Sequence, residues 1–149
     1  MAIPLSVLLE AKERPALFTV SPDATVLEAV ALMNREKIGS VLVCGVDGAI
    51  GIFTERDVLV RVVSAGRDPA TTLVGQVMTA PFVAVAASTT IEEAMQIITT
   101  RRCRHLPVRG EDGRIIGLVS IGDITRWIVR DQESQIDGLV EYISGQYPA

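Results

Sequence analysis

The sequence predicts an α+β fold in which two β-α-β-β-α units pack on each other with pseudo-two-fold symmetry, flanked by short N-terminal and C-terminal helices. The first observation is an internal repeat: the same order of turn, helix-start and strand signals occurs twice, about 65 residues apart. The second is composition, since 48% of the 149 residues are hydrophobic but only 4% are aromatic, which indicates an aliphatic core. The third is size, because a single unit of about 50 residues would bury its apolar sheet face poorly.

The first predicted region, 1–66, holds an N-terminal helix and the first unit. Leucines at helical spacing predict a short helix that packs on the main body, at Leu5, Leu8 and Leu9. The unit follows as a strand at 17–20, a helix begun by the capping box of Thr25 and Glu28, strands at 38–44 and 49–53, and a helix from Thr54 to Gly66. Asp47 and Gly48 predict the hairpin turn between the last two strands.

The second unit, 80–130, repeats this order. It has a strand at 82–85, a helix begun by the capping box of Thr90 and Glu93, strands at 104–108 and 115–119 around a turn at Asp112 and Gly113, and a last helix from Ser120. Two such copies in one chain indicate a repeat architecture, which takes precedence over an interpretation of any single motif.

Two further regions lie outside the units. The connector 67–79 has apolar residues at helical spacing, so it predicts a short helix, at Leu73, Val74, Val77 and Met78. The tail 131–149 carries a narrow apolar seam at Ile136, Leu139, Val140 and Ile143. Because an isolated helix this short is marginal in water, we expect the tail to pack on the body or on a partner subunit.

One short motif occurs at the same place in both units. Residues 51–57 and 117–123 each read as Gly, two apolar residues, a hydroxyl residue, two variable positions and Asp. Each motif lies at a predicted strand-to-helix turn. The hydroxyl and the carboxylate can cap the helix, and they can also hold a polar ligand over its N-terminus, where free N–H groups favour anions.

The ordered set of motifs resembles a tandem pair of cystathionine-β-synthase (CBS) domains, sometimes called a Bateman module. The resemblance lies at 20–29, 38–43 and 51–57 in the first copy, at 90–94, 104–108, 112–113 and 117–123 in the second, and at 77–79 in the connector. It covers about residues 16–130. No single motif is specific, but the ordered set, present twice, is. Because nothing outside it is long enough for a catalytic domain, the sequence is typical of the stand-alone form.

The resemblance implies nucleotide contacts at the two hydroxyl–carboxylate pairs. In this family the Asp carboxylate accepts hydrogen bonds from ribose hydroxyls and the Ser or Thr hydroxyl lies near the phosphate. The candidates are therefore Thr54, Asp57, Ser120 and Asp123. The chemistry agrees, because a cis-diol offers two donors and an ionised carboxylate only accepts. Capping and ligand binding can coexist at the same pair.

A basic cluster distinguishes the second copy from the first. Arg101 and Arg102 fit a solvated helix end, where the helix dipole favours cations. Arg104 and His105 enter the strand, where the family's phosphate-facing residues lie, and an Arg fork suits phosphate. The first copy has Gly39 and Ser40 at the matching positions. We therefore expect two unequal pockets, the one near Arg104 and His105 preferring the more highly charged ligand.

An adenine ring needs a flat apolar slot with backbone donors and acceptors at its edge. Candidates around one pocket are Thr19, Val20 and Val41, and around the other Ala84, Val85 and Leu106. For each of these residues a plain core position is an equally good interpretation.

Other classes of function have little support in the sequence. The net charge of −4 argues against nucleic-acid binding through bulk charge. No apolar run approaches the roughly 18 residues of a membrane span, and two cysteines make no disulfide framework, so we expect a cytoplasmic protein. There is no phosphate loop, zinc-binding helix or Cys-x-x-Cys motif. A single histidine excludes a multi-histidine metal site. A Ser-His-Asp set from Ser120 and His105 is conceivable but has little support, so no catalytic residue, metal or required cofactor is expected.

The resulting hypothesis is a regulatory module that senses an adenine nucleotide (AMP, ADP or ATP) in the groove between the repeats. The alternatives are a binder of S-adenosylmethionine or NAD(H), and a structural or adaptor protein with empty pockets that acts through its surface. The family resemblance implies a homodimer. An unknown protein partner is a further candidate for binding.

Overall fold

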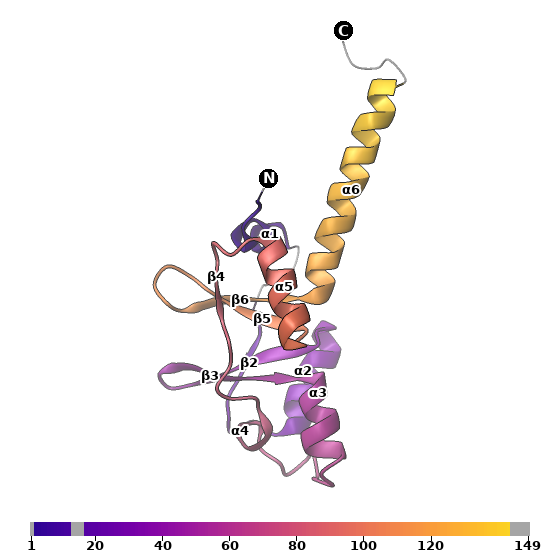
Figure 1. The fold of residues 1–149 in the computed structure, drawn as a ribbon. Coiled ribbons are helices and arrows are strands. Elements are labelled where there is room, and N and C mark those ends of the chain that lie inside the picture. Colours follow the sequence, from indigo (N-terminus) through magenta and orange to yellow (C-terminus); the bar gives the residue numbers. More distant parts are fainter. Residues whose placement is uncertain (1, 13–16, 144–149) are drawn as a thin grey trace.

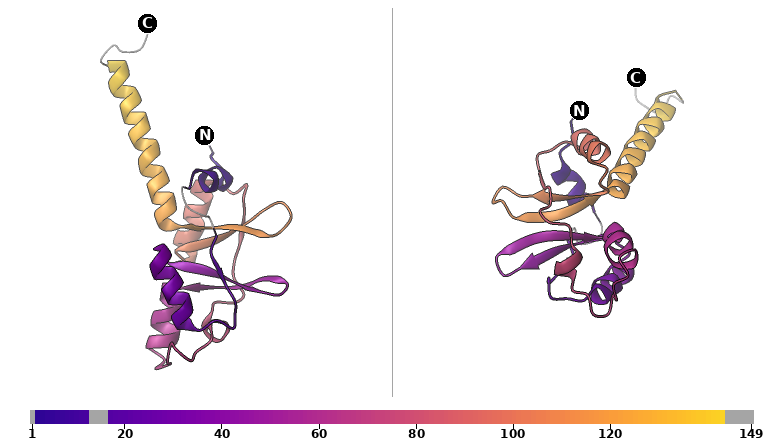
Figure 2. Two further views of the ribbon diagram at one scale, coloured as in Figure 1. Left: turned by 180° about the vertical axis from the view of Figure 1, so that it is seen from behind. Right: turned by 60° about the horizontal axis from the view of Figure 1, so that its bottom comes forward.

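The computed structural model describes residues 2–12 and 17–143, with the side chain of residue 142 excepted. It contains two three-stranded sheets, with strand orders β1-β2-β3 and β4-β5-β6. Figure 1 and Figure 2 show the two sheets stacked, with their hairpins projecting on one side and the helices lying mainly on the other. The predicted α+β fold with two repeats is confirmed.

The first repeat consists of β1 (Thr19–Val20), α2 (Val26–Glu36), β2 (Ser40–Gly45), β3 (Gly48–Thr54), α3 (Glu55–Asp57) and the π-helix η1 (Val58–Val63). The second consists of β4 (Val85–Ala86), α5 (Ile91–Arg101), β5 (His105–Arg109), β6 (Ile115–Ser120) and the start of α6 (Ile121–Ile143). In each repeat the first strand pairs in parallel with the second, which pairs antiparallel with the third.

The repeats match in local detail as well as in order. The capping boxes predicted at Thr25 and Thr90 are both present, each hydroxyl accepting from the backbone N–H of a Glu three residues on. Both helices then end on a residue in the left-handed conformation, Lys37 (φ 55°) and Arg102 (φ 54°). The sheet register places Ser40 opposite Thr54 and His105 opposite Ser120, so Ser40 and His105 hold equivalent positions.

Three expectations differ from the structure. The outer strands β1 and β4 are shorter than predicted, because in each of them only two residues form pairs with the neighbouring strand. The helix after Thr54 changes from α to π at Val58, in a segment rich in valine, whose stiff side chains lower helix propensity. The connector is helical only over α4 (Val74–Val77).

The N-terminal helix α1 (Leu5–Ala11) belongs structurally to the second repeat. Its Leu5 and Leu8 are buried in the core that α5, β5 and β6 form. The backbone N–H of Leu5 donates to the carbonyl of Thr89. The connector helix α4 has the same relation to the first repeat, where the N–H of Val74 donates to the carbonyl of Ala24. Each repeat is therefore completed by a short helix that comes from outside its predicted boundaries.

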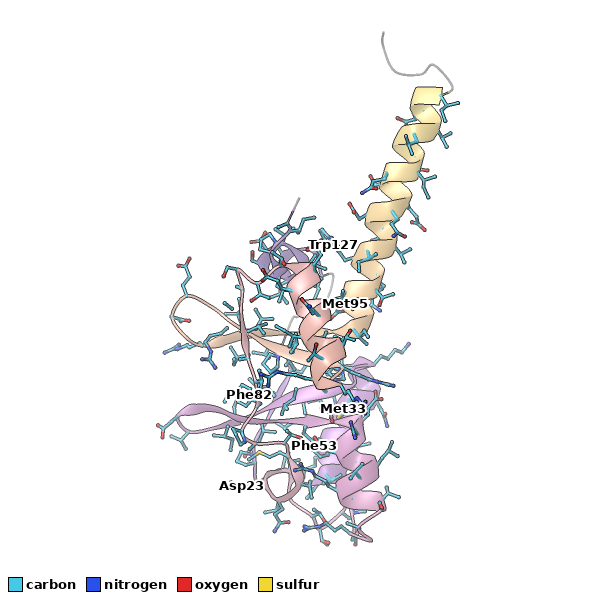
Figure 3. All side chains as sticks on the ribbon, viewed as in Figure 1. Asp23, Met33, Phe53, Phe82, Met95 and Trp127 are labelled. Carbon is cyan, nitrogen blue, oxygen red and sulfur yellow. The ribbon has the colours of Figure 1, made fainter. Side chains whose placement is uncertain are left out.

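The apolar core has three parts. One cluster fills each repeat, centred on Phe53 in the first and Leu106 in the second, both almost fully buried. A third cluster, with Leu42, Ile52 and Leu118, lies between the sheets, and Phe82 packs against it (Figure 3). The stacked repeats thus share one sheet-to-sheet interface, as the poor burial of a single unit predicts.

The last helix and the tail form one continuous element. The helix α6 runs from Ile121 to Ile143, so the predicted last helix of the second unit and the first part of the tail are a single helix. Its second half extends away from the body (Figure 1). Residues 144–149 of the predicted tail lie outside the described residues. Within the described ranges no helix is both long and apolar enough to cross a membrane.

Candidate functional site

The repeated hydroxyl–carboxylate motif forms a helix cap in both repeats. In the first, the backbone N–H of Asp57 donates to the Thr54 hydroxyl (3.3 Å) and the Thr54 N–H donates to Asp57 Oδ2 (3.0 Å). In the second, the Asp123 N–H donates to the Ser120 hydroxyl (3.1 Å) and the Ser120 N–H donates to Asp123 Oδ2 (2.9 Å). The capping interpretation is therefore confirmed at both places.

Each of these carboxylates has a second partner from the segment that follows the completing helix. The Thr79 hydroxyl, just after α4, donates to Asp57 Oδ1 at 2.9 Å. The Lys12 ammonium, just after α1, donates to Asp123 Oδ2 at 3.0 Å and also to the carbonyl of Leu118 at 3.2 Å. The two repeats thus use the same arrangement with a neutral donor in one and a cation in the other.

Arginines on the following helical turn complete the two carboxylate sites. Arg61 Nε lies 3.6 Å from Asp57 Oδ1, and Arg126 donates from a terminal guanidinium nitrogen to Asp123 Oδ1 at 2.7 Å. Both carboxylates are shielded, with side-chain exposure of 7% for Asp57 and 10% for Asp123.

A cavity of about 630 Å³ adjoins the second carboxylate and lies between the repeats. Five of the predicted site residues line it: Ser40, Arg104, His105, Ser120 and Asp123. Further lining residues that sequence reasoning missed are Lys12, Lys37, Glu55, Arg126, Trp127 and Arg130. This volume falls within the range of small-molecule sites.

The remaining predicted site residues do not line this cavity. Thr54 and Asp57 lie at the other repeat's cap, and Thr19 is exposed on β1. Val41 (0% exposed) and Val85 (9% exposed) belong to the apolar cores of their repeats. The cavity therefore brings together the second of the two predicted pairs and the basic residues, but not the first pair.

The charge of the cavity wall is unbalanced. Its cationic side chains are Lys12, Lys37, Arg104, Arg126 and Arg130, whereas its acidic ones are Glu55 and Asp123. The N-terminal turn of α6, from Ile121 to Asp123, also forms part of the wall, and a helix N-terminus attracts anions. An anionic ligand is thus favoured by both side-chain charge and backbone dipoles.

Burial and neighbouring charges shift the pKa of two groups here. Desolvation lowers the pKa of His105 below 6.5, and this exceeds the opposing effect of the Glu55 and Asp123 carboxylates. Burial alone would raise the pKa of Asp123, but hydrogen bonds from Ser120 and the Lys12 charge outweigh it and keep that pKa below 3.8. Near neutral pH the wall therefore holds a neutral imidazole beside an ionised carboxylate.

Gly39 allows the two repeats to approach each other at the cavity. A Cβ atom at this position would lie 2.8 Å from Glu55 Oε1 and 3.0 Å from His105 Nε2. The Gly39 carbonyl also accepts a hydrogen bond from the Glu55 N–H at 3.0 Å. Glycine at the position equivalent to Arg104 thus leaves room for the side chain of His105 from the second repeat.

The side chains that line this cavity offer several kinds of binding interaction. Cations, an acceptor-only carboxylate, hydroxyl groups and the indole of Trp127 can hold an anionic ligand with a polar diol and a flat ring. Within residues 2–12 and 17–143, no group of three His, Cys, Asp or Glu side chains is placed to hold a metal ion.

Comparison with known proteins gives a consistent picture. The family model described as "CBS domain" matches residues 13–64 and 74–130. The chain is 38% identical over 130 residues to CBS domain-containing protein CBSX3, mitochondrial, from Arabidopsis thaliana, covering 84% of this chain and 63% of the relative. It also spans only 57% of an uncharacterized relative from Methanopyrus kandleri.

Solved structures match the fold over most of the chain. A CBS-domain protein from Burkholderia ambifaria is 37% identical, with a TM-score of 0.82, and the match covers 87% of this chain and 96% of that one. A hexameric CBS-CP12 protein from bloom-forming cyanobacteria is 28% identical, with a TM-score of 0.72 over 84% of this chain and 71% of the other. Two matched repeats, shared architecture and this level of identity together place the chain in the CBS domain family, as a tandem CBS pair.

Proposed function

We propose that this tandem CBS pair is a regulatory module that binds an adenine nucleotide in the cavity beside Asp123. One observation carries the proposal: a cavity between the repeats combines a cationic wall, a helix N-terminus and a shielded carboxylate. The cations and the helix N-terminus suit phosphates, and the carboxylate suits the two hydroxyls of a ribose. Asp57, outside this cavity, has the same proposed ribose role for a second, weaker site.

The charge of the wall favours ADP or ATP over AMP. Arg104, Lys37 and Arg130 add positive charge in addition to the two cations already paired with Asp123. A ribose at Asp123 would share or displace Lys12 and Arg126, which would release these cations toward the phosphates. Both repeats line the cavity, so a bound nucleotide would favour the packing arrangement of the repeats to which it binds more tightly. The size of this effect is set by the difference between its affinities for the two arrangements.

The other assignments follow from this one. We propose no catalytic role and no required cofactor, a homodimeric state, and action through a protein partner, without nucleic-acid or membrane binding. The Arabidopsis relative is named as mitochondrial, so a cytoplasmic location stays a prediction. Binding of S-adenosylmethionine or NAD(H) remains the second candidate, because both carry an adenosine ribose.

A thermal-shift screen with ATP, ADP, AMP, NADH and S-adenosylmethionine tests the proposal. A ligand present at 100 times its Kd adds about 2.7 kcal/mol to the free energy of unfolding, which is readily detected as a higher Tm. We expect ATP to give the largest shift. If no ligand raises the Tm at millimolar concentration, nucleotide sensing is refuted and the adaptor function takes its place.

A further inference from the structure

The carboxylate of Asp123 has little capacity left for a ligand in this structure. An ionised carboxylate only accepts hydrogen bonds, and its two oxygens offer about four lone-pair positions. Asp123 Oδ2 accepts from the Ser120 N–H at 2.9 Å and from the Lys12 ammonium at 3.0 Å. The other oxygen, Oδ1, accepts from Arg126 at 2.7 Å. A ribose diol donates through two hydroxyls, so at least one of these partners has to leave before both hydroxyls can bind.

The two cations on this carboxylate differ in how firmly they are held. The side chain of Arg126 is 64% exposed and lies three residues from Asp123 on the same helix, so it can turn into solvent at little cost. The side chain of Lys12 is only 21% exposed, and its ammonium also donates to the carbonyl of Leu118 at 3.2 Å. Helix α1 ends directly before Lys12, and Leu8 of that helix is buried in the core of the second repeat. Lys12 is therefore the partner that limits access to the carboxylate.

The first repeat shows that the fold does not require a lysine at this place. There the Thr79 hydroxyl, which also follows a short completing helix, donates to Asp57 Oδ1 at 2.9 Å. The Asp57 side chain is 7% exposed, so a neutral hydroxyl serves as this partner even for a well-shielded carboxylate. Asp123 has a similar exposure of 10%, yet its corresponding partner is the ammonium of Lys12. A role in the cavity, rather than in the cap, accounts for the lysine.

We propose that Lys12 determines which ligands the cavity accepts, because it occupies the Asp123 carboxylate until a ligand supplies another anion. This inference rests on the proposed binding of a nucleotide beside Asp123. A nucleoside without phosphate displaces the ammonium and gives it no new partner, so a shielded cation loses its ion pair. A nucleoside polyphosphate brings phosphate oxygens into the cavity that Lys12 lines, so the ammonium exchanges one anion for another. Lys12 thus selects for phosphorylated ligands.

Isothermal titration of the full-length protein with adenosine and with ATP tests this role. We expect Lys12→Met to tighten adenosine binding at least about fivefold, and to change ATP binding less because ATP loses a cation together with a competitor. If adenosine binds the wild type too weakly to measure, measurable binding to Lys12→Met is the same result. Lys12→Gln, also neutral, should act in the same direction, whereas Lys12→Arg should keep the wild-type ratio of the two affinities. The matched control is Arg114→Met, which removes a positive charge from an exposed hairpin and should change neither affinity.

Three results would each overturn the inference. If Lys12→Met and Lys12→Gln bind ATP and adenosine with the wild-type ratio, Lys12 does not select the ligand, although nucleotide binding itself stands. If both variants lose affinity for the two ligands by the same factor, Lys12 only supports the shape of the cavity. If neither ligand binds the wild type or either variant, the proposed nucleotide function fails together with this inference.

Discussion

The two repeats differ in the side chain that partners their equivalent carboxylates, which is Lys12 for Asp123 and Thr79 for Asp57. Lys12 and Asp123 are 111 positions apart in the chain, yet they form a 3.0 Å ion pair with side-chain exposures of only 21% and 10%. The equivalent carboxylate of the first repeat accepts instead from the neutral Thr79 hydroxyl. The asymmetry that the sequence predicts from Arg104 and His105 therefore extends to the partner of the carboxylate itself.

Replacing Lys12 tests how much this pair stabilises the second repeat. Lys12→Met removes the charged donor and leaves Asp123 with Arg126 and the Ser120 N–H, so we expect the free energy of unfolding to fall by about 1–2 kcal/mol. Urea denaturation measures this. Lys37→Met is the matched control, since Lys37 lines the same cavity without a Lys12-type ion pair, and it should change stability by less than about 0.5 kcal/mol. Equal effects of the two substitutions would contradict the assigned role of Lys12.

His105 gives the protein a pH dependence of defined sign. Because its pKa in the folded state lies below 6.5, the unfolded chain binds the proton more readily. Stability from this group is complete above pH 6.5 and is lost as the pH falls through the lower, folded-state pKa. Asp123 adds a separate loss at more acidic pH, below 3.8. Urea denaturation between pH 8 and pH 5 should show the first loss, and His105→Gln should remove it; a variant as pH-sensitive as the wild type would refute the assignment.

Where the two repeats meet at the cavity, position 39 has little room for any side chain larger than that of glycine. Gly39→Ala places a methyl group within 3.0 Å of both Glu55 and His105, so these side chains must move. We expect a loss of about 0.5–1.5 kcal/mol, because the crowded atoms are the ends of side chains that must turn aside. Gly138→Ala is the control, because a Cβ atom there meets nothing within 4 Å and alanine favours a helix interior. Denaturation curves that show no loss for Gly39→Ala would contradict the close approach.

The elements show which features local sequence determines. The capping boxes at Thr25 and Thr90 and the two strand-to-helix turns were predictable, because their partners lie three residues apart. The Lys12–Asp123 pair and the place of Glu55 in the cavity were not, because each depends on the packing of distant segments. The continuity of α6 was also missed, since polar residues after Arg130 read as a break although they lie on an exposed helix face.

The matched helices α2 and α5 allow one prediction at this scale. Thr25→Ala and Thr90→Ala each remove a hydroxyl that accepts from the backbone N–H of the third helical residue, at 3.1 Å and 3.2 Å. We expect each substitution to cost about 1 kcal/mol, with similar values because the two caps are equivalent. Chemical denaturation of both variants checks this, and a large difference between them would show that the two caps are not energetically equivalent.

At the scale of the whole molecule, each repeat is completed by a short helix from another part of the chain. Helix α1 fills the second core with Leu5 (0% exposed) and carries Lys12 to the cavity, although it precedes the first repeat in the chain. Sequence periodicity predicted that this helix packs on the body but could not indicate which repeat it completes. Cavity geometry and global stability are therefore coupled through the N-terminal segment.

The central claim is that the cavity beside Asp123 binds a nucleotide, and isothermal titration with ATP tests it most directly. The protein should bind ATP, and Asp123→Asn should weaken binding at least tenfold, because a hydrogen bond to a charged group contributes about 1.5–3 kcal/mol. Asp112→Asn, on the exposed hairpin, should bind as the wild type does. Equal ATP affinity for the Asp123→Asn variant and the wild type, or no binding by either, would contradict the account.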